Sequence, residues 1–126
     1  MRENSYLNIE KLSAYKVAYN LGNMIWSLII KWDYFAKDTI GKQLARSIDS
    51  ISANIAEGFG RYHKKDKIKF YYNARASVIE SEDWLKKAKD RFLVDERKYQ
   101  NIFLALEQLP KEINQLIRFT DQKLTI

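Results

Sequence analysis

Apolar residues recur every three or four positions through four stretches of this chain, which is the spacing of an amphipathic helix. Between Gln43 and Arg61 the apolar residues share one helical face, because successive residues turn by about 100°: Leu44, Ile48, Ile51, Ile55 and Phe59. Helices are predicted at about residues 9–32, 39–59, 66–92 and 95–122. We therefore expect an all-α fold, an antiparallel up-down four-helix bundle that forms a single domain over residues 1–126.

The limits of the second helix are predicted from its flanking residues. A loop at residues 32–38 precedes it, and Asp38 or Thr39 can cap its first turn with a side-chain oxygen. Gly58 and Gly60 supply the backbone freedom that ends a helix. The chain is therefore expected to turn directly after this segment.

Acidic residues mark the start of the other two long helices. Asp66 is the candidate cap of the third helix, and Asp95 opens the fourth. The inward face of the third helix combines small and large residues: Phe70, Ala74, Ser77, Val78, Ser81, Trp84, Leu85, Ala88 and Phe92. Pro110 lies inside the fourth helix, but the apolar phase continues across it, so we expect one bent helix there and not two.

The first helix carries more apolar surface than one face of a bundle needs. Two adjoining stripes cover roughly 220° of its circumference: Ala14, Ala18, Leu21, Ile25, Leu28 and Trp32, and Leu12, Tyr15, Tyr19, Gly22, Trp26 and Ile29. This excess of apolar surface predicts that the first helix is buried on two sides, once by its own bundle and once by another subunit. The residues expected at such contacts are Tyr15, Tyr19 and Trp26, and Tyr72 and Ile79 of the third helix. The alternative is a wide core helix within a small domain.

Composition narrows the class of protein. The chain has 126 residues, 46% of them hydrophobic, and it has no cysteine, so disulfides and thiolate chemistry are excluded. The N-terminus lacks the continuous apolar segment of a signal peptide. The longest apolar run, Met24 to Ile30, is broken by Ser27 and is too short to cross a bilayer. We expect a cytoplasmic protein without a membrane partner.

The positive charge is concentrated in the middle of the chain. The formal net charge is +6, and residues 41–92 hold 12 basic and 7 acidic residues. The densest basic segment lies between the second and third helices, and it predicts an anionic partner, RNA or DNA: Arg61, Lys64, Lys65, Lys67 and Lys69. The alternative is a solvated loop whose charges only keep the protein soluble.

No set of residues suited to a reaction is found. The single histidine, His63, lies in the basic segment, and the Glu-x-x-His pairs of a di-iron bundle are absent. No phosphate-binding glycine loop or nucleophile motif occurs, so no enzyme activity, metal or cofactor is expected. Five polar residues of the second and third helices are better interpreted as a structural motif that fixes helix register or subunit contacts: Arg46, Asn54, Glu57, Arg75 and Glu80.

Two segments, QLARSIDSISANIAEGFGR from Gln43 and FYYNARASVIESEDWL from Phe70, carry a family resemblance. They are similar to the central helices of a bacterial four-helix-bundle family named after intervening sequences in 23S ribosomal RNA genes. Ala76 and Ser52 depart from the glycine and proline usual there. The resemblance implies a cytosolic bundle that assembles as a ring, a homopentamer, without established enzymatic activity. A related accessory protein of bacterial retroelements has a similar architecture and binds nucleic acid.

Two function classes follow. The first is a non-enzymatic oligomer that binds RNA or DNA by phosphate contacts through its basic segment. The second is a structural or adaptor oligomer that holds an unidentified protein partner, with its basicity incidental. Salt-dependent nucleic-acid binding separates the two classes, because each neutralised phosphate steepens the salt dependence.

Overall fold

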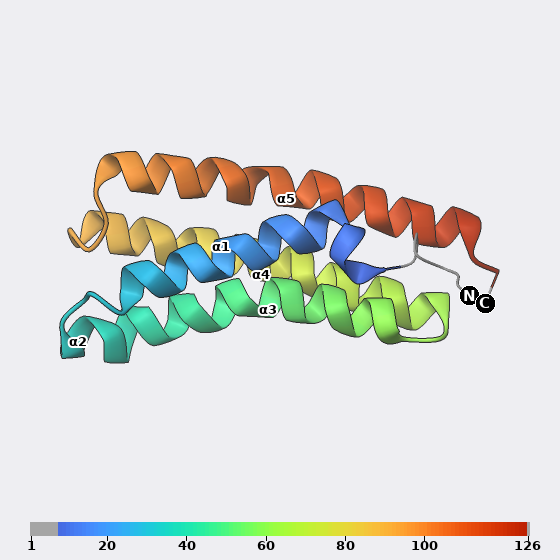
Figure 1. Ribbon diagram of the computed structural model, residues 1–126, viewed down its shortest axis with the longest axis horizontal. Helices are drawn as coiled ribbons and strands as arrows, with labels where there is room; N and C mark the ends of the chain where they lie inside the picture. The colour runs from blue at the N-terminus through green and yellow to red at the C-terminus, as the bar shows by residue number, and fades with distance from the viewer. Residues whose placement is uncertain (1–7, 126) are drawn as a thin grey trace.

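Four long α-helices run alternately up and down in the computed structural model, which describes residues 8–125 (Figure 1). Their bounds are α1 Ser13–Ile29, α3 Lys42–Gly60, α4 Lys64–Asp90 and α5 Glu96–Lys123. Three short elements accompany them: η2 Ile9–Lys11, α2 Tyr34–Ala36 and the π-helical turn η3 Lys37–Gly41. Within residues 8–125 there is no strand. The prediction of an all-α four-helix bundle is confirmed.

The packing order of the helices follows the chain. α1 packs against α3, α3 against α4 and α4 against α5, and α5 closes the bundle against α1. α1 and α4 therefore lie on one diagonal, and α3 and α5 lie on the other. Consequently the side of the bundle formed by α1 and α3 is opposite the side formed by α4 and α5.

The predicted apolar stripe of α3 forms the centre of the core. Leu44, Ile48, Ile51 and Ile55 are fully buried, and Phe59 is half-buried at the end of the helix. They meet fully buried residues of the other three helices: Leu21, Ile25, Val78, Leu85, Leu106, Leu109 and Ile113. Burying each such side chain stabilises the fold by about 1.5–3 kcal/mol before the entropic cost of ordering it.

Small residues let α3 and α4 approach closely. Ser81 donates its hydroxyl to the Ser47 hydroxyl at 3.0 Å, and Ser50 donates to Ser77 at 2.6 Å, so these partly or fully buried polar groups satisfy one another. At Gly58 an added Cβ would lie 2.7 Å from the Tyr71 ring. The small side chains predicted on the third helix thus serve a tight helix contact.

The start of the second long helix differs from the prediction. Asp33, and not Asp38 or Thr39, is the cap, because its Oδ1 accepts a hydrogen bond from Ala36 N at 2.9 Å. From there α2, η3 and α3 follow without a break, so the loop expected at residues 32–38 is wrong beyond Asp33. Ala36 and Ile40 are buried in line with Leu44, at the helical spacing of four residues, and their burial is the physical reason for the longer helical segment.

The first and last helices agree with the prediction except at their ends. Helix α1 ends at Ile29, short of the predicted Trp32, whose buried indole donates to the Leu93 carbonyl at 2.9 Å. Asp95 caps α5 by accepting a hydrogen bond from Lys98 N at 2.8 Å. Pro110 lies within α5, which remains one helix as predicted.

Both ends of α4 correct the prediction. The helix begins at Lys64 after His63, so Asp66 lies in its first turn and is not its cap. It ends at Asp90, and Phe92, expected on the inward face, is 94% exposed. Two hydrogen bonds close this end as a Schellman turn, Leu93 N to Ala88 O at 2.9 Å and Phe92 N to Lys89 O at 3.1 Å. That turn reverses the chain and carries Phe92 out of the core.

Candidate functional site

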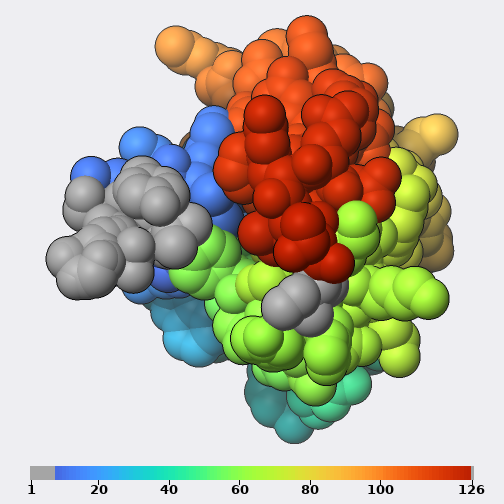
Figure 2. Space-filling model, turned by 90° about the vertical axis from the view of Figure 1, so that its right-hand side faces the viewer, coloured from blue at the N-terminus to red at the C-terminus, as the bar shows by residue number. Residues whose placement is uncertain are grey.

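The five predicted cations lie together at one end of the bundle, on the α3–α4 connection and the first turns of α4. Figure 2 looks onto this end, where the connection (green) lies beside the end of α5 (red). The same end is reached by the carboxyl terminus of α3 and the amino terminus of α4. Helix amino termini and exposed lysines both favour anions.

Two of these cations are held by helix carboxyl ends. Lys64 donates its ammonium to the carbonyls of Asp121 at 3.0 Å and Leu124 at 3.2 Å, and it lies 3.6 Å from the Asp121 carboxylate. Lys67 donates to the Phe59 carbonyl at 2.8 Å, and burial lowers the pKa of its ammonium. Both satisfy carbonyls that a helix end leaves unpaired, so their role in the fold is structural.

The other three cations point to solvent. Lys65 and Lys69 are exposed one helical turn apart on α4, and no acidic side chain of the described residues lies within 4.0 Å of either ammonium. Arg61 is partly exposed, pairs with Glu57 at 2.8 Å and lies over the Phe70 ring at 4.7 Å. Of the five predicted cations, Lys65 and Lys69 are therefore the most accessible to an anion, and Arg61 follows them.

Tyr62 and His63 lie between these cations. Both are exposed, and their rings meet edge to face with centroids 5.0 Å apart. Neither ring belongs to the core, so both are accessible for stacking on a base.

The predicted subunit contacts fall on two opposite sides of the bundle. On the α1–α3 side, Tyr15 and Tyr19 have ring centroids 5.7 Å apart, and Tyr19 and Trp26 are 52% and 60% exposed. Gly22 of this stripe lies against Asp49 of α3, where an added Cβ would be 2.6 Å from Oδ1. We call this surface the α1–α3 face.

Tyr72 and Ile79 lie on the other side, at the α4–α5 seam. They line a shallow hollow of about 460 Å³ together with Arg75, Pro110 and Asn114. We call this surface the α4–α5 face. Because the two faces are opposite, one subunit can offer each face to a different neighbour.

The predicted polar motif does not form one cluster. Arg75 donates to Asn114 Oδ1 and lies over the Tyr72 ring, so it joins α4 to α5. Asn54 donates to the Ser50 carbonyl of its own helix, and Glu80 accepts from the Trp84 indole. Arg46 is exposed. Only Arg75 links two helices through its side chain, and a structural role for the other members stays a prediction.

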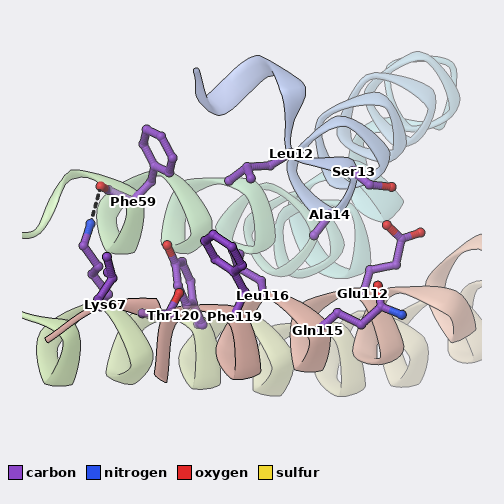
Figure 3. A pocket seen from close by; sticks show the side chains of 12 residues that line it. Leu12, Ser13, Ala14, Phe59, Lys67, Glu112, Gln115, Leu116, Phe119 and Thr120 are labelled. Carbon is purple, nitrogen blue, oxygen red and sulfur yellow. Dashed lines mark hydrogen bonds between the residues drawn. The ribbon is translucent and has the colours of Figure 1, made fainter. Parts of the chain in front are cut away.

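A mostly apolar cavity lies at the end of the bundle that bears the five predicted cations. It was not predicted from the sequence. Its volume is about 520 Å³, and Figure 3 shows it between the start of α1 and the ends of α3 and α5. Its walls include Leu12, Phe59, Tyr71, Leu116, Phe119 and Lys67. Burial raises the pKa of the Tyr71 phenol to about 12, although a hydrogen bond with Thr120 opposes the shift. Residues from four helices line the cavity, so no single segment signals it.

The described residues hold no constellation for metal chemistry. Over residues 8–125, no three His, Asp or Glu side chains lie close enough together to bind an ion. Nor does any helix in that part of the chain have the length and apolarity needed to cross a membrane.

One family matches most of the chain. The sequence model of the 23S rRNA-intervening sequence proteins matches residues 10–115. The chain belongs to this family. The solved structures similar to it include a protein of unknown function from the S23 ribosomal protein family of Bacteroides thetaiotaomicron, with 22% identity and a TM-score of 0.74. That match covers 83% of this chain and 98% of the other, and at this identity it establishes the fold alone. No curated protein sequence matches the chain.

Proposed function

We propose that this 23S rRNA-intervening sequence family protein is a non-enzymatic, cytoplasmic oligomer that binds RNA or DNA by phosphate contacts. One observation carries the proposal: Lys65 and Lys69 lie exposed one turn apart at the start of α4, and neither ammonium has an acidic side chain of the described residues within 4.0 Å. Contacts of this kind hold a phosphate backbone and read little sequence, so weak base preference is expected.

Assembly would multiply these contacts. The α1–α3 face and the α4–α5 face are different surfaces on opposite sides, which favours a head-to-tail contact over a two-fold one. Head-to-tail contacts form a closed ring when the rotation closes, and the family resemblance suggests five subunits. Each subunit would then present one Lys65–Lys69 pair, and several weak contacts would combine into useful affinity.

A salt titration with matched variants tests this function. The wild-type protein, Lys65→Glu/Lys69→Glu and Lys16→Glu/Lys111→Glu are each titrated into labelled RNA and DNA duplexes at several salt concentrations. The two double variants change the net charge equally, and all four lysines are exposed. Only the first variant should lose affinity and flatten the salt dependence, because only it removes the proposed phosphate contacts. Light scattering confirms that oligomer size is unchanged.

A specific observation favours the adaptor function as the second candidate. Lys64 and Lys67 are engaged by backbone carbonyls, so the basic segment offers fewer free charges than its sequence suggests. If the wild-type protein binds neither RNA nor DNA at low salt, nucleic-acid binding is wrong and a ring that holds a protein partner replaces it.

A further inference from the structure

Phe92 occupies a position that suits it poorly as part of the fold. It is a non-glycine residue with φ 62°, at the Schellman position where glycine is favoured, and its side chain is 94% exposed. A bulky residue in the left-handed region is strained, and an exposed ring gains almost no packing energy in return. The ring therefore adds nothing to the stability of the described bundle.

Two more exposed rings lie at the same end of the bundle, opposite the Lys65–Lys69 end. Tyr34 and Phe35 of α2 are 78% and 76% exposed. The α1–α2 and α4–α5 connections both lie at this end (Figure 1). The Trp32 indole donates a hydrogen bond to the Leu93 carbonyl and so ties the two connections together. We call the end that bears Tyr34, Phe35 and Phe92 the aromatic end.

Six basic residues lie in or near the helix ends that bear these rings. They are exposed, and among the described residues none has an acidic side chain within 4.0 Å: Lys31, Lys37, Lys86, Arg91, Arg97 and Lys98. Two of the acids at this end, Asp33 and Asp95, are used as helix caps. The aromatic end thus combines accessible rings with unpaired positive charge.

We propose that the aromatic end binds single-stranded RNA or DNA, with Phe92, Tyr34 and Phe35 stacking on unpaired bases and the basic side chains following the backbone. Exposed rings interleaved with cations are the recurring design of single-strand binding surfaces. Consecutive helical side chains such as Tyr34 and Phe35 diverge by about 100°, which suits splayed bases better than a flat membrane. This proposal rests on the proposed function and adds to it a preference for unpaired strands.

The decisive variant is Phe92→Gly, because strain and stacking predict opposite effects. Glycine adopts φ 62° without strain, so the melting temperature should rise by about 3 °C. Affinity for an oligouridine of about 12 nucleotides should fall about tenfold, whereas affinity for an RNA duplex should stay within about twofold. A purely structural residue cannot gain stability and lose single-strand binding together.

Two further variants complete the experiment. Tyr34→Ser/Phe35→Ser should weaken oligouridine binding similarly, and Leu104→Ser, which removes an exposed apolar side chain from the third turn of α5, should not. If Phe92→Gly binds oligouridine as tightly as the wild-type protein does, the stacking proposal is overturned and the proposal of phosphate binding is left intact. The stacking proposal is also overturned if Phe92→Gly loses affinity for anionic vesicles and keeps its affinity for oligouridine. If the wild-type protein binds no nucleic acid, the proposed function itself has failed.

Discussion

The Lys67 ammonium lies 2.8 Å from the carbonyl oxygen of Phe59, so a residue of the basic segment closes the carboxyl end of the preceding helix. Lys67 also lies 5.7 Å from the centroid of the Phe59 ring. The two residues therefore fix the angle at which α4 leaves α3. In the sequence Lys67 resembles part of a nucleic-acid site, but in the structure its ammonium makes a contact within the fold.

Lys67→Met should lower the free energy of unfolding by about 1–2 kcal/mol, because it removes a charged donor from helix-end carbonyls. Thermal or urea unfolding measures the loss. Lys65→Met, two residues away and exposed, is the control and should change stability by less than about 0.5 kcal/mol. Equal effects of the two variants would contradict the capping role of Lys67.

Gly58→Ala should destabilise the protein by about 2 kcal/mol. The added methyl group would lie 2.7 Å from the Tyr71 ring and 2.9 Å from the Lys67 carbonyl oxygen, so α3 and α4 must separate. Gly60→Ala is a matched control two residues away, since nothing lies within 4 Å of its added Cβ. Urea unfolding should place Gly60→Ala at or above wild-type stability, and a stable Gly58→Ala would show that the helix contact is looser than described.

Head-to-tail assembly predicts the outcome of mixing two variants. Trp26→Ser damages the α1–α3 face and Ile79→Asp damages the α4–α5 face, and both side chains are exposed in the described bundle. Each variant alone should be monomeric by light scattering, because each lacks one half of the only interface. An equimolar mixture should form heterodimers and nothing larger, since one intact contact remains between the two variants.

Two-fold assembly predicts something else. Each variant would keep one self-complementary face and form homodimers, and mixing would add nothing. Met24→Ser, an exposed apolar residue of α1, controls for a general loss of apolar surface and should leave the oligomer intact. Because Trp26 is 60% exposed in the described bundle, its truncation should not unfold the subunit.

The stability of the protein should depend on the protonation of Asp49. Partial burial against α1 raises the pKa of this carboxyl above its ordinary value of 3.8, so just above pH 3.8 the folded protein retains more of this proton than the unfolded chain does. Lowering the pH through the range just above 3.8 therefore neutralises a charge that destabilises the fold. Conversely, the contribution of Asp49 to the free energy of unfolding falls as the pH rises through this range.

Asp49→Asn tests this linkage. At pH 7 it should raise the melting temperature slightly, because the neutral amide carries no charge to desolvate, and solvent screening keeps the effect small. The difference from wild type should shrink as the pH falls through the raised pKa of Asp49, because the carboxyl then gains a proton and becomes neutral like the amide. Asp83→Asn is the opposite control, because that carboxylate pairs with Lys87 at 2.6 Å and its loss should not stabilise the protein.

Periodicity predicted the interior of the helices well. The Leu44–Ile55 stripe is set by the 3.6-residue period, which the sequence displays directly, and its burial was predicted correctly. Helix ends were predicted less well, because several residues can cap and tertiary packing selects among them. Asp33 caps in place of Asp38 since helix α2 lets Ala36 join the core.

The candidate site was harder to predict for a similar reason. Arg61, Lys64, Lys65, Lys67 and Lys69 form one basic segment in the sequence, but the fold directs Lys64 and Lys67 to carbonyls of neighbouring helices. Their partners, Asp121 and Phe59, lie 57 and 8 residues away along the chain. The spacing of residues within the basic segment does not encode contacts with other helices. Phe92 was predicted to lie on the inward face because it continues the apolar spacing of the third helix. That spacing does not reveal where the chain reverses when no glycine marks the turn.

The neighbour-to-neighbour packing of the helices has a consequence for how the chain folds. α1, α3 and α4 each meet the helix that follows them, so most native contacts link segments close in sequence. Low contact order of this kind gives folding in microseconds to milliseconds, and it allows helical hairpins to form while the ribosome is still adding residues. Among the packed pairs of long helices in residues 8–125, the seam between α5 and α1 joins the helices that are farthest apart in the sequence. We expect its closure to be the last step, delayed until the carboxyl-terminal helix has left the exit tunnel.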